Sequence, residues 1–170
     1  MAENEWGVVL VGHGAVAKDC PRELVRRFKA AEARRQATGG EPTAEERELE
    51  QRIRRWPRTS ASDTYQAGIE ALAERLQPLL PGGLLAVAYN EFCAPSVEEA
   101  VHELAEKGVK EITVVPTMMT PGGVHSEIDI PQSLQQAQVA LPKVKIRYAW
   151  PFDLDRLAEM LASHLAHRGR

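Results

Sequence analysis

The sequence predicts an α/β fold in which a four-stranded parallel sheet is flanked by helices. Four short segments are nearly continuous in aliphatic residues, as in strands that are covered on both faces. Segments with apolar residues at helical spacing lie between them, and this alternation of strand and helix is typical of a parallel sheet. The 170 residues fit a single domain, 1–170, that is large enough to bury a core.

The predicted strands are rich in Val, Ile and Leu. They span residues 7–11, 84–88, 111–116 and 145–150, and the second is extended to Phe92 in the longest interpretation. Right-handed crossovers bring the loops that follow parallel strands to one edge of the sheet, where α/β proteins bind their ligands. Side chains in these loops are therefore the first candidates for function.

The predicted helices share apolar residues that recur every three or four positions on one face. They span residues 21–38, 63–80, 96–107, 131–140 and 153–167. Asp63 is the expected N-cap of the second helix, and Gly108 stands where a helix-ending glycine is common.

A charged helical insertion is predicted over residues 34–58. It contains Thr43-Ala-Glu-Glu46, a capping-box pattern that predicts a helix to about Arg55. Because few of its residues are apolar, a solvent-exposed arm is the simpler interpretation. The alternative is a lid or dimer contact in which Trp56 and four arginines face an anionic ligand. These arginines are Arg52, Arg54, Arg55 and Arg58.

The composition argues against several classes of function. A net charge of −3 and a pI near 6.0 do not provide the basic surface that nucleic-acid partners need. No apolar run approaches the ~18 residues of a membrane span, and the acidic N-terminus is unlike a signal peptide. We therefore expect a cytoplasmic protein without a membrane partner. Cys20 and Cys93 are expected to be buried, reduced thiols.

Two histidines and a glutamate follow three of the predicted strands. His13 lies between two glycines, Glu91 follows the second strand, and His125 lies in a Gly-rich loop after the third. Each residue alone has a simpler interpretation. His13 could be a turn histidine, Glu91 a solvated carboxylate, and the loop of His125 only a flexible connection. Together at one sheet edge, two imidazoles and a carboxylate form a site suited to Fe²⁺, Co²⁺, Ni²⁺ or Zn²⁺.

Four neighbouring residues have two interpretations each. Glu127 and Asp129 are candidate partners that orient His125. The alternative for both is N-terminal capping of the helix before Ile130-Pro131, which explains Asp129 at least as well. Met118 and Met119 end the third strand, where core packing is the simpler interpretation and contact with a large flat ligand is the alternative.

At these residues the chain resembles the small class II chelatases of modified tetrapyrrole biosynthesis, the sirohydrochlorin cobaltochelatase type. The matching segments are Gly12-His13-Gly14, Asn90-Glu91-Phe92 with Pro95, Val114-Val-Pro116, and the Gly-rich loop to His125 and Asp129-Ile-Pro131. The resemblance covers most of the chain, from Gly7 to about Leu141. It implies a chelatase-like sheet in which His13 and His125 bind the incoming metal, with Glu91 as a further ligand or proton acceptor.

The resemblance also implies an activity. It is the ATP-independent insertion of Co²⁺, with Fe²⁺ or Ni²⁺ as alternatives, into sirohydrochlorin or a related tetrapyrrole, in cobalamin or siroheme biosynthesis. The metal is then a substrate, and no organic cofactor is expected. Longer members of the family join two such domains, so a single copy implies a homodimer that places two sites around a shared cleft. Because sirohydrochlorin has eight carboxylates, cationic side chains should line the cleft, with Lys18, Arg22 and the insertion arginines as candidates.

Two other functions share some of these features. A non-catalytic carrier of metal or tetrapyrrole would use the same ligands as the enzyme. A histidine-dependent hydrolase or phosphotransferase would use His13 as a nucleophile, but it would leave the motif at His125 without a role.

Overall fold

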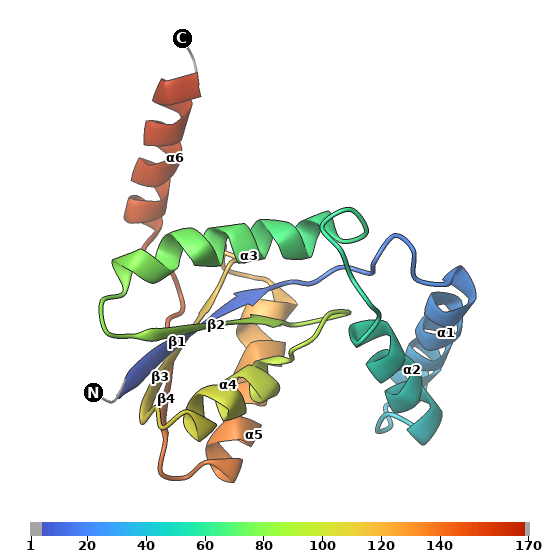
Figure 1. Ribbon diagram of the computed structural model, residues 1–170. Coiled ribbons are helices and arrows are strands. Elements are labelled where there is room, and N and C mark those ends of the chain that lie inside the picture. The colour runs from blue at the N-terminus through green and yellow to red at the C-terminus, as the bar shows by residue number, and fades with distance from the viewer. Residues whose placement is uncertain (1–4, 169–170) are drawn as a thin grey trace.

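The computed structural model describes residues 5–168 and contains a sheet of four parallel strands (Figure 1). The strands are β1 (Trp6–Gly12), β2 (Leu84–Tyr89), β3 (Glu111–Pro116) and β4 (Lys145–Tyr148). Their order is β2-β1-β3-β4, and every pairing is parallel, so the predicted fold class is confirmed. Strand β4 ends at Tyr148, before the predicted end at residue 150. Pro151 has no backbone N–H and could not continue the hydrogen bonds between the strands.

Six α-helices accompany the sheet within residues 5–168. They are α1 (Arg22–Thr38), α2 (Ala44–Arg54), α3 (Thr64–Leu76), α4 (Val97–Glu106), α5 (Ile130–Ala140) and α6 (Leu154–Arg168). In Figure 1, α3 lies above the sheet, whereas α4 and α5 lie below it. The helix predicted to reach residue 80 ends at Leu76 and continues as a 3₁₀ turn, Gln77–Leu79, that contains Pro78.

The largest hydrophobic core lies between the sheet and the pair α4 and α5. Val9 and Val11 of β1, Ile112 and Val114 of β3 are fully buried there, and Leu104 of α4 packs against them. Burial of each such aliphatic side chain contributes about 1.5–3 kcal/mol. This packing therefore stabilises the strands whose ends carry the loops of interest.

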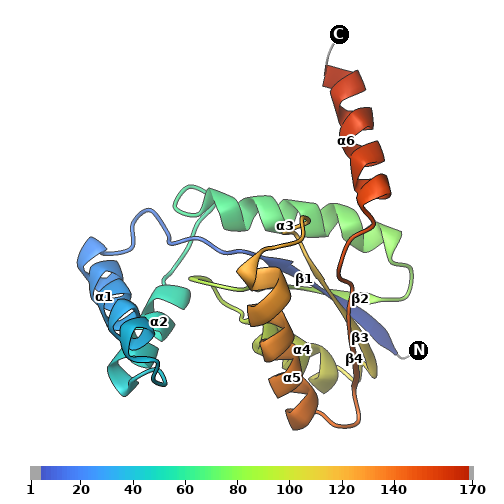
Figure 2. The same ribbon diagram turned by 180° about the vertical axis from the view of Figure 1, so that it is seen from behind.

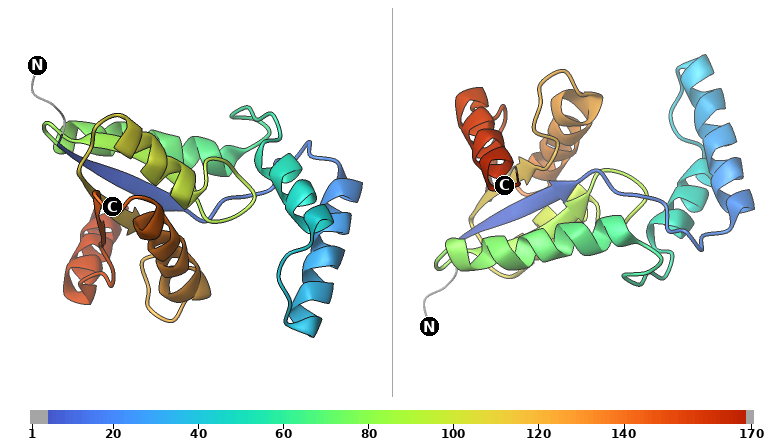
Figure 3. Two further views of the ribbon diagram at one scale, coloured as in Figure 1. Left: turned by 90° about the horizontal axis from the view of Figure 1, so that it is seen from below. Right: turned by 90° about the horizontal axis from the view of Figure 1, so that it is seen from above.

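The helices α1 and α2 form a hairpin beside the end of the sheet (Figure 3). The hairpin has its own small core, in which Leu24 and Phe28 of α1 pack with Leu49 and Ile53 of α2. The helix predicted from the capping box is present, but only half of the box forms, because Glu46 N donates to Thr43 Oγ1 at 3.1 Å without a return bond. The division of the chain into a domain and an insertion at 34–58 stays a prediction.

The last helix, α6, extends away from the sheet (Figure 2). It has no buried residue, and its Leu161 and Leu165 are more than half exposed. Within residues 5–168, no helix is both long and apolar enough to cross a membrane.

Candidate metal centre

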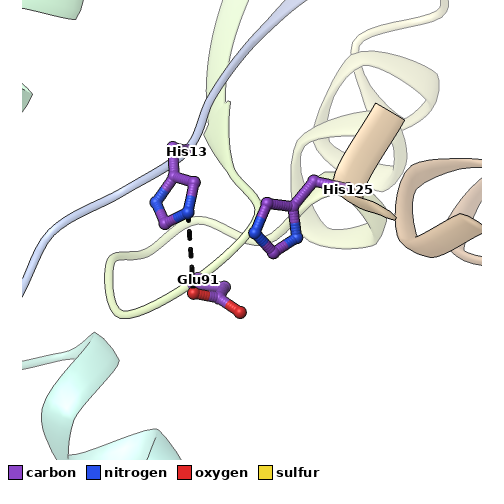
Figure 4. Close-up of side chains that lie close together, drawn as sticks. All are labelled: His13, Glu91 and His125. Carbon is purple, nitrogen blue, oxygen red and sulfur yellow. Dashed lines mark ion pairs between the residues drawn. The ribbon is translucent and has the colours of Figure 1, made fainter. Parts of the chain in front are cut away.

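Three loops at the carboxyl edge of the sheet bring His13, Glu91 and His125 together (Figure 4). One ligand atom from each side chain lies within 4.8 Å of the others. His13 Nε2 is 3.8 Å from Glu91 Oε2, and the two imidazole rings meet edge to face with centroids 4.6 Å apart. All three side chains are partly exposed, so a dissolved ion can reach them. Their role as metal ligands stays a prediction.

The first loop holds His13 with its Nε2 atom toward the other two residues. His13 Nδ1 is 2.8 Å from the carbonyl oxygen of Gly14, so Nδ1 carries the proton and Nε2 keeps a lone pair. The His13 N–H donates to the hydroxyl of Tyr65 at 2.8 Å, and the Glu91 N–H donates to the His13 carbonyl at 2.8 Å. Backbone bonds therefore join the His13 and Glu91 loops directly.

Gly14 permits this close approach of the two loops. Its φ of +94° lies in the left-handed region, and a Cβ at this position would stand 1.8 Å from the carbonyl oxygen of Glu91. No other residue type fits there without moving the Glu91 loop.

The third loop ends in a π-helical turn, His125–Asp129, that leads into α5. His125 Nδ1 lies 2.7 Å from Asp129 Oδ2, so an Nδ1–H group donates to this carboxylate and Nε2 is available for a ligand. The amide nitrogen of Asn90 lies 2.8 Å from the same Nδ1, but it cannot donate to a nitrogen that carries a hydrogen; its acceptor in this tautomer is Asp129 Oδ2 at 3.5 Å. Asp129 makes no side-chain cap bond, so the structure favours its interpretation as the partner of His125.

The other predicted partner of His125 has a different position. Glu127 accepts a bond from the backbone N–H of Gly122 at 2.7 Å and thereby braces the Gly-rich loop. The prediction that Glu127 orients His125 is therefore wrong. Tyr148, which the sequence analysis did not single out, donates from its hydroxyl to the carbonyl of Ser126 at 2.9 Å and ties β4 to the π-turn.

Two insertion arginines donate hydrogen bonds to backbone carbonyls of the Glu91 loop. Arg54 donates to the carbonyls of Asn90 at 2.7 Å and Cys93 at 3.1 Å, and Arg58 donates to the carbonyl of Phe92. Arg58 is thus bonded to backbone oxygens and to the Asp63 carboxylate, which corrects the alternative in which it faces an anionic ligand. Arg54 bonds backbone oxygens and Glu50 and also lines the cleft described below. Sequence spacing could not reveal the bonds to the Glu91 loop, since each joins residues more than thirty positions apart.

A cleft of about 650 Å³ opens beside the three residues, within the size range of ligand pockets. Its acidic side chains outnumber its basic ones: Glu32, Glu50, Glu91 and Asp129 against Arg35 and Arg54. Lys18 and Arg22 are not among the residues that line it. The predicted cationic lining is thus limited to two arginines in this chain.

Sequence comparisons relate this chain to known chelatases. A family model described as CbiX matches residues 57–167. The chain is 39% identical over 66 residues to a sirohydrochlorin cobaltochelatase of Methanopyrus kandleri, a match that covers 39% of this chain and 46% of the relative. A sirohydrochlorin cobaltochelatase of Sulfurisphaera tokodaii is 39% identical over 79 residues, covering 46% of this chain and 62% of the relative. The chain thus matches about half the length of these curated relatives.

A solved structure shares the fold over 96% of the chain. The putative cobalamin (vitamin B12) biosynthesis CbiX protein of Marinobacter aquaeolei VT8 is 19% identical in sequence, with a TM-score of 0.57 and 96% of both chains covered. At this identity the likeness concerns the fold alone, and it supports the chelatase-like parallel sheet.

Proposed function

The chain belongs to the CbiX family, and from this premise we propose that it inserts a divalent metal ion into sirohydrochlorin or a related tetrapyrrole. We propose Co²⁺ as the preferred metal ahead of Fe²⁺, with ATP not required. The observation that supports this most directly is the convergence of His13, Glu91 and His125, of which Glu91 and His125 line the cleft. Cobalamin or siroheme biosynthesis is the proposed pathway.

In this reaction one divalent cation enters the macrocycle and two pyrrole N–H protons leave it. The cation must first lose water, and imidazole and carboxylate ligands replace part of its hydration shell. Two Nε2 lone pairs and one carboxylate leave coordination positions free. An open, partly exposed site of this kind holds the ion loosely enough to pass it to the four pyrrole nitrogens.

The same side chains are suited to accept the released protons. Once the ion has left, the Nε2 atoms of His13 and His125 are two available bases, one for each pyrrole proton, and Glu91 Oε2 lies 3.8 Å from His13 Nε2. The carbonyl of Gly14 and the carboxylate of Asp129 keep both Nδ1 protons in place, so proton and metal exchange are confined to the Nε2 atoms.

We further propose that the chain acts as a cytoplasmic homodimer, with the metal ion as substrate and no organic cofactor. The cleft supports the dimer, because Arg35 and Arg54 are few cations for a substrate with eight carboxylates. A second copy facing the cleft would add basic side chains to the substrate site.

An anaerobic insertion assay with sirohydrochlorin and Co²⁺, Fe²⁺ or Ni²⁺ tests the proposal through the absorbance change on metallation. Insertion rates decide the metal, because affinity alone follows the Irving–Williams order and favours Ni²⁺. We expect many turnovers from the wild type and no turnover from His13→Ala or His125→Ala. His164→Ala, on the exposed face of α6, is the matched control and should keep full activity. Near-normal rates in both site variants would contradict the assignment, and product limited to one equivalent would indicate a carrier.

A further inference from the structure

The cleft beside the three site residues has two chemically different walls. The hairpin and α5 stand apart from each other in Figure 2, and residues of both line the cleft. The hairpin wall has four charged side chains, Glu32, Arg35, Glu50 and Arg54. The other wall begins at the His125 turn and continues along α5. Beyond the turn, the side chains of this α5 wall are uncharged, and they are Gln132, Ser133 and Gln136.

The cations of the hairpin wall are already paired with carboxylates. Arg35 Nε donates to Glu46 Oε1 at 2.8 Å, and the Glu46 side chain is only 3% exposed. Glu46 Oε2 has no hydrogen-bond partner among the described residues, so Arg35 is the group that compensates this buried charge. Arg54 Nε donates to Glu50 Oε1 at 2.8 Å, and its other nitrogens donate to backbone carbonyls. Both guanidinium charges are therefore offset within the protein.

The remaining carboxylates make the hairpin wall unfavourable for anions. Burial raises the pKa of the Glu32 carboxyl, and the negative charge of Glu91 raises it further, although Arg35 acts in the opposite direction. Like charges therefore act on one another along this side of the cleft. Because sirohydrochlorin has eight carboxylates, the hairpin wall repels it.

The α5 wall has the features that a flat macrocycle with carboxylates around its rim requires. Val124, directly before His125, is 59% exposed and gives the cleft an apolar surface. Gln132 and Gln136 are four residues apart, so they lie on one side of the helix and about 6 Å apart along its axis. Both side chains are exposed, and their amide N–H groups can donate to carboxylates. An apolar contact next to His125 is thus combined with hydrogen-bond donors further along the same wall.

We propose that the α5 wall binds the tetrapyrrole, with Val124 against the ring and with Gln132 and Gln136 as donors to its carboxylates. This inference rests on the proposed function, from which it takes the class of substrate. Amide donors have an advantage over arginines at this place, because they do not repel a divalent cation at the neighbouring histidines. A ring in contact with Val124 lies next to His125, which holds the ion in the proposed reaction.

Binding of metal-free sirohydrochlorin to the full chain tests this inference, with ultrafiltration and the absorbance of the unbound macrocycle as the measurement. Gln132→Glu and Gln136→Glu keep the size of the side chain but replace its donor with a negative charge. Each should raise the Kd by about tenfold or more. Gln135→Glu adds the same charge to the same helix at an exposed position outside the cleft lining, and it should keep the wild-type Kd. Equal Kd values in the three variants, or no binding by the wild type, would overturn the inference.

A second pair of variants tests the apolar contact. Val124→Thr keeps the shape of the side chain and should raise the Kd a few-fold, whereas Val139→Thr, at a position of α5 that is 78% exposed, should not change it. An unchanged Kd in Val124→Thr would overturn the contact with the ring. Thermal unfolding of every variant checks that it is folded.

Because this binding needs no metal, its outcome is separate from that of the proposed function. Sirohydrochlorin binding that follows the expected pattern, without turnover in the metallation assay, would contradict insertion and support the α5 wall. Metallation by the wild type, together with wild-type Kd values in Gln132→Glu and Gln136→Glu, would overturn the α5 wall and support insertion.

Discussion

Arg58 and Asp63 form a buried ion pair between the end of the helical hairpin and the start of α3. Their side chains are 6% and 2% exposed. From this position the Arg58 guanidinium also donates to the carbonyls of Ala15 at 2.9 Å and of Phe92, which lie in two of the loops that form the candidate metal centre. One buried side chain therefore joins the hairpin, α3 and both of these loops.

Replacement of Arg58 by Met should lower the free energy of unfolding by about 3–5 kcal/mol, because it leaves the Asp63 carboxylate buried and unpaired. Urea denaturation measures this loss. Arg52→Met, at an exposed position on α2, is the control and should change stability by less than about 0.5 kcal/mol. Adding Asp63→Asn to Arg58→Met should recover part of the loss, since Asn removes the charge and still accepts the bond from Gln66 N. Equal losses in the Arg58 and Arg52 variants would contradict this account.

Gly14→Ala should weaken Co²⁺ binding at the histidines. The new Cβ would lie 1.8 Å from the carbonyl oxygen of Glu91, so the Glu91 loop would have to move. Gly122→Ala is a matched control, since its φ of +92° imposes a similar backbone strain of about 1–2 kcal/mol with open space around the Cβ. Equilibrium dialysis and thermal unfolding compare the two. A Gly14→Ala protein that binds Co²⁺ as well as Gly122→Ala would show that the contact between the loops is unimportant.

Asp129→Asn should reduce metal affinity or the insertion rate by about 10–100-fold, because the carboxylate sets the orientation and tautomer of His125. Glu127→Gln is the matched control. It removes a carboxylate of the same turn, and this carboxylate accepts a bond from Gly122 N and does not contact His125. It should retain near-normal metallation. Equal effects of the two substitutions on the insertion rate would mean that the turn needs negative charge and not a specific partner for His125.

Cys93 should react slowly with Ellman's reagent in the native protein. Burial raises the pKa of this thiol to about 11, so roughly one molecule in a thousand carries the reactive thiolate at pH 8. The labelling rate should rise about tenfold per pH unit below pH 11, and unfolding in urea should make labelling fast. Rapid labelling of the folded protein at pH 8 would contradict the burial of this thiol.

The same shift in the pKa of Cys93 affects stability at high pH. Its pKa in the folded state lies above the usual thiol value of 9.0, so the folded state keeps a proton that the unfolded state loses. This contribution is complete below pH 9 and should disappear as the pH rises toward 11. Urea denaturation of Cys93→Ala and the wild type at pH 8 and pH 10.5 should show a smaller pH-dependent loss in the variant.

Local patterns predicted the sheet and the three residues at its edge. The aliphatic runs that became β1 and β3 are recognisable because strands covered on both faces need continuous apolar residues. His13, Glu91 and His125 could be predicted because each follows a strand, and parallel topology gathers the ends of strands. The prediction for Glu127 was wrong because both carboxylates of the π-turn lie close to His125 in sequence. Only the turn geometry decides that Asp129 contacts His125 whereas Glu127 contacts Gly122.

By itself, the sequence determined the fold class and the residues that meet at the candidate metal centre, since hydrophobic periodicity and strand position are local properties. Only the tertiary structure decided what surrounds them. The bonds of Arg54 and Arg58 to distant carbonyls, the contact of Tyr65 with His13 and the unpaired oxygen of Glu46 leave no periodic signal. They arise because packing of the hairpin against the sheet buries polar groups, which must then find partners among residues far away in the chain.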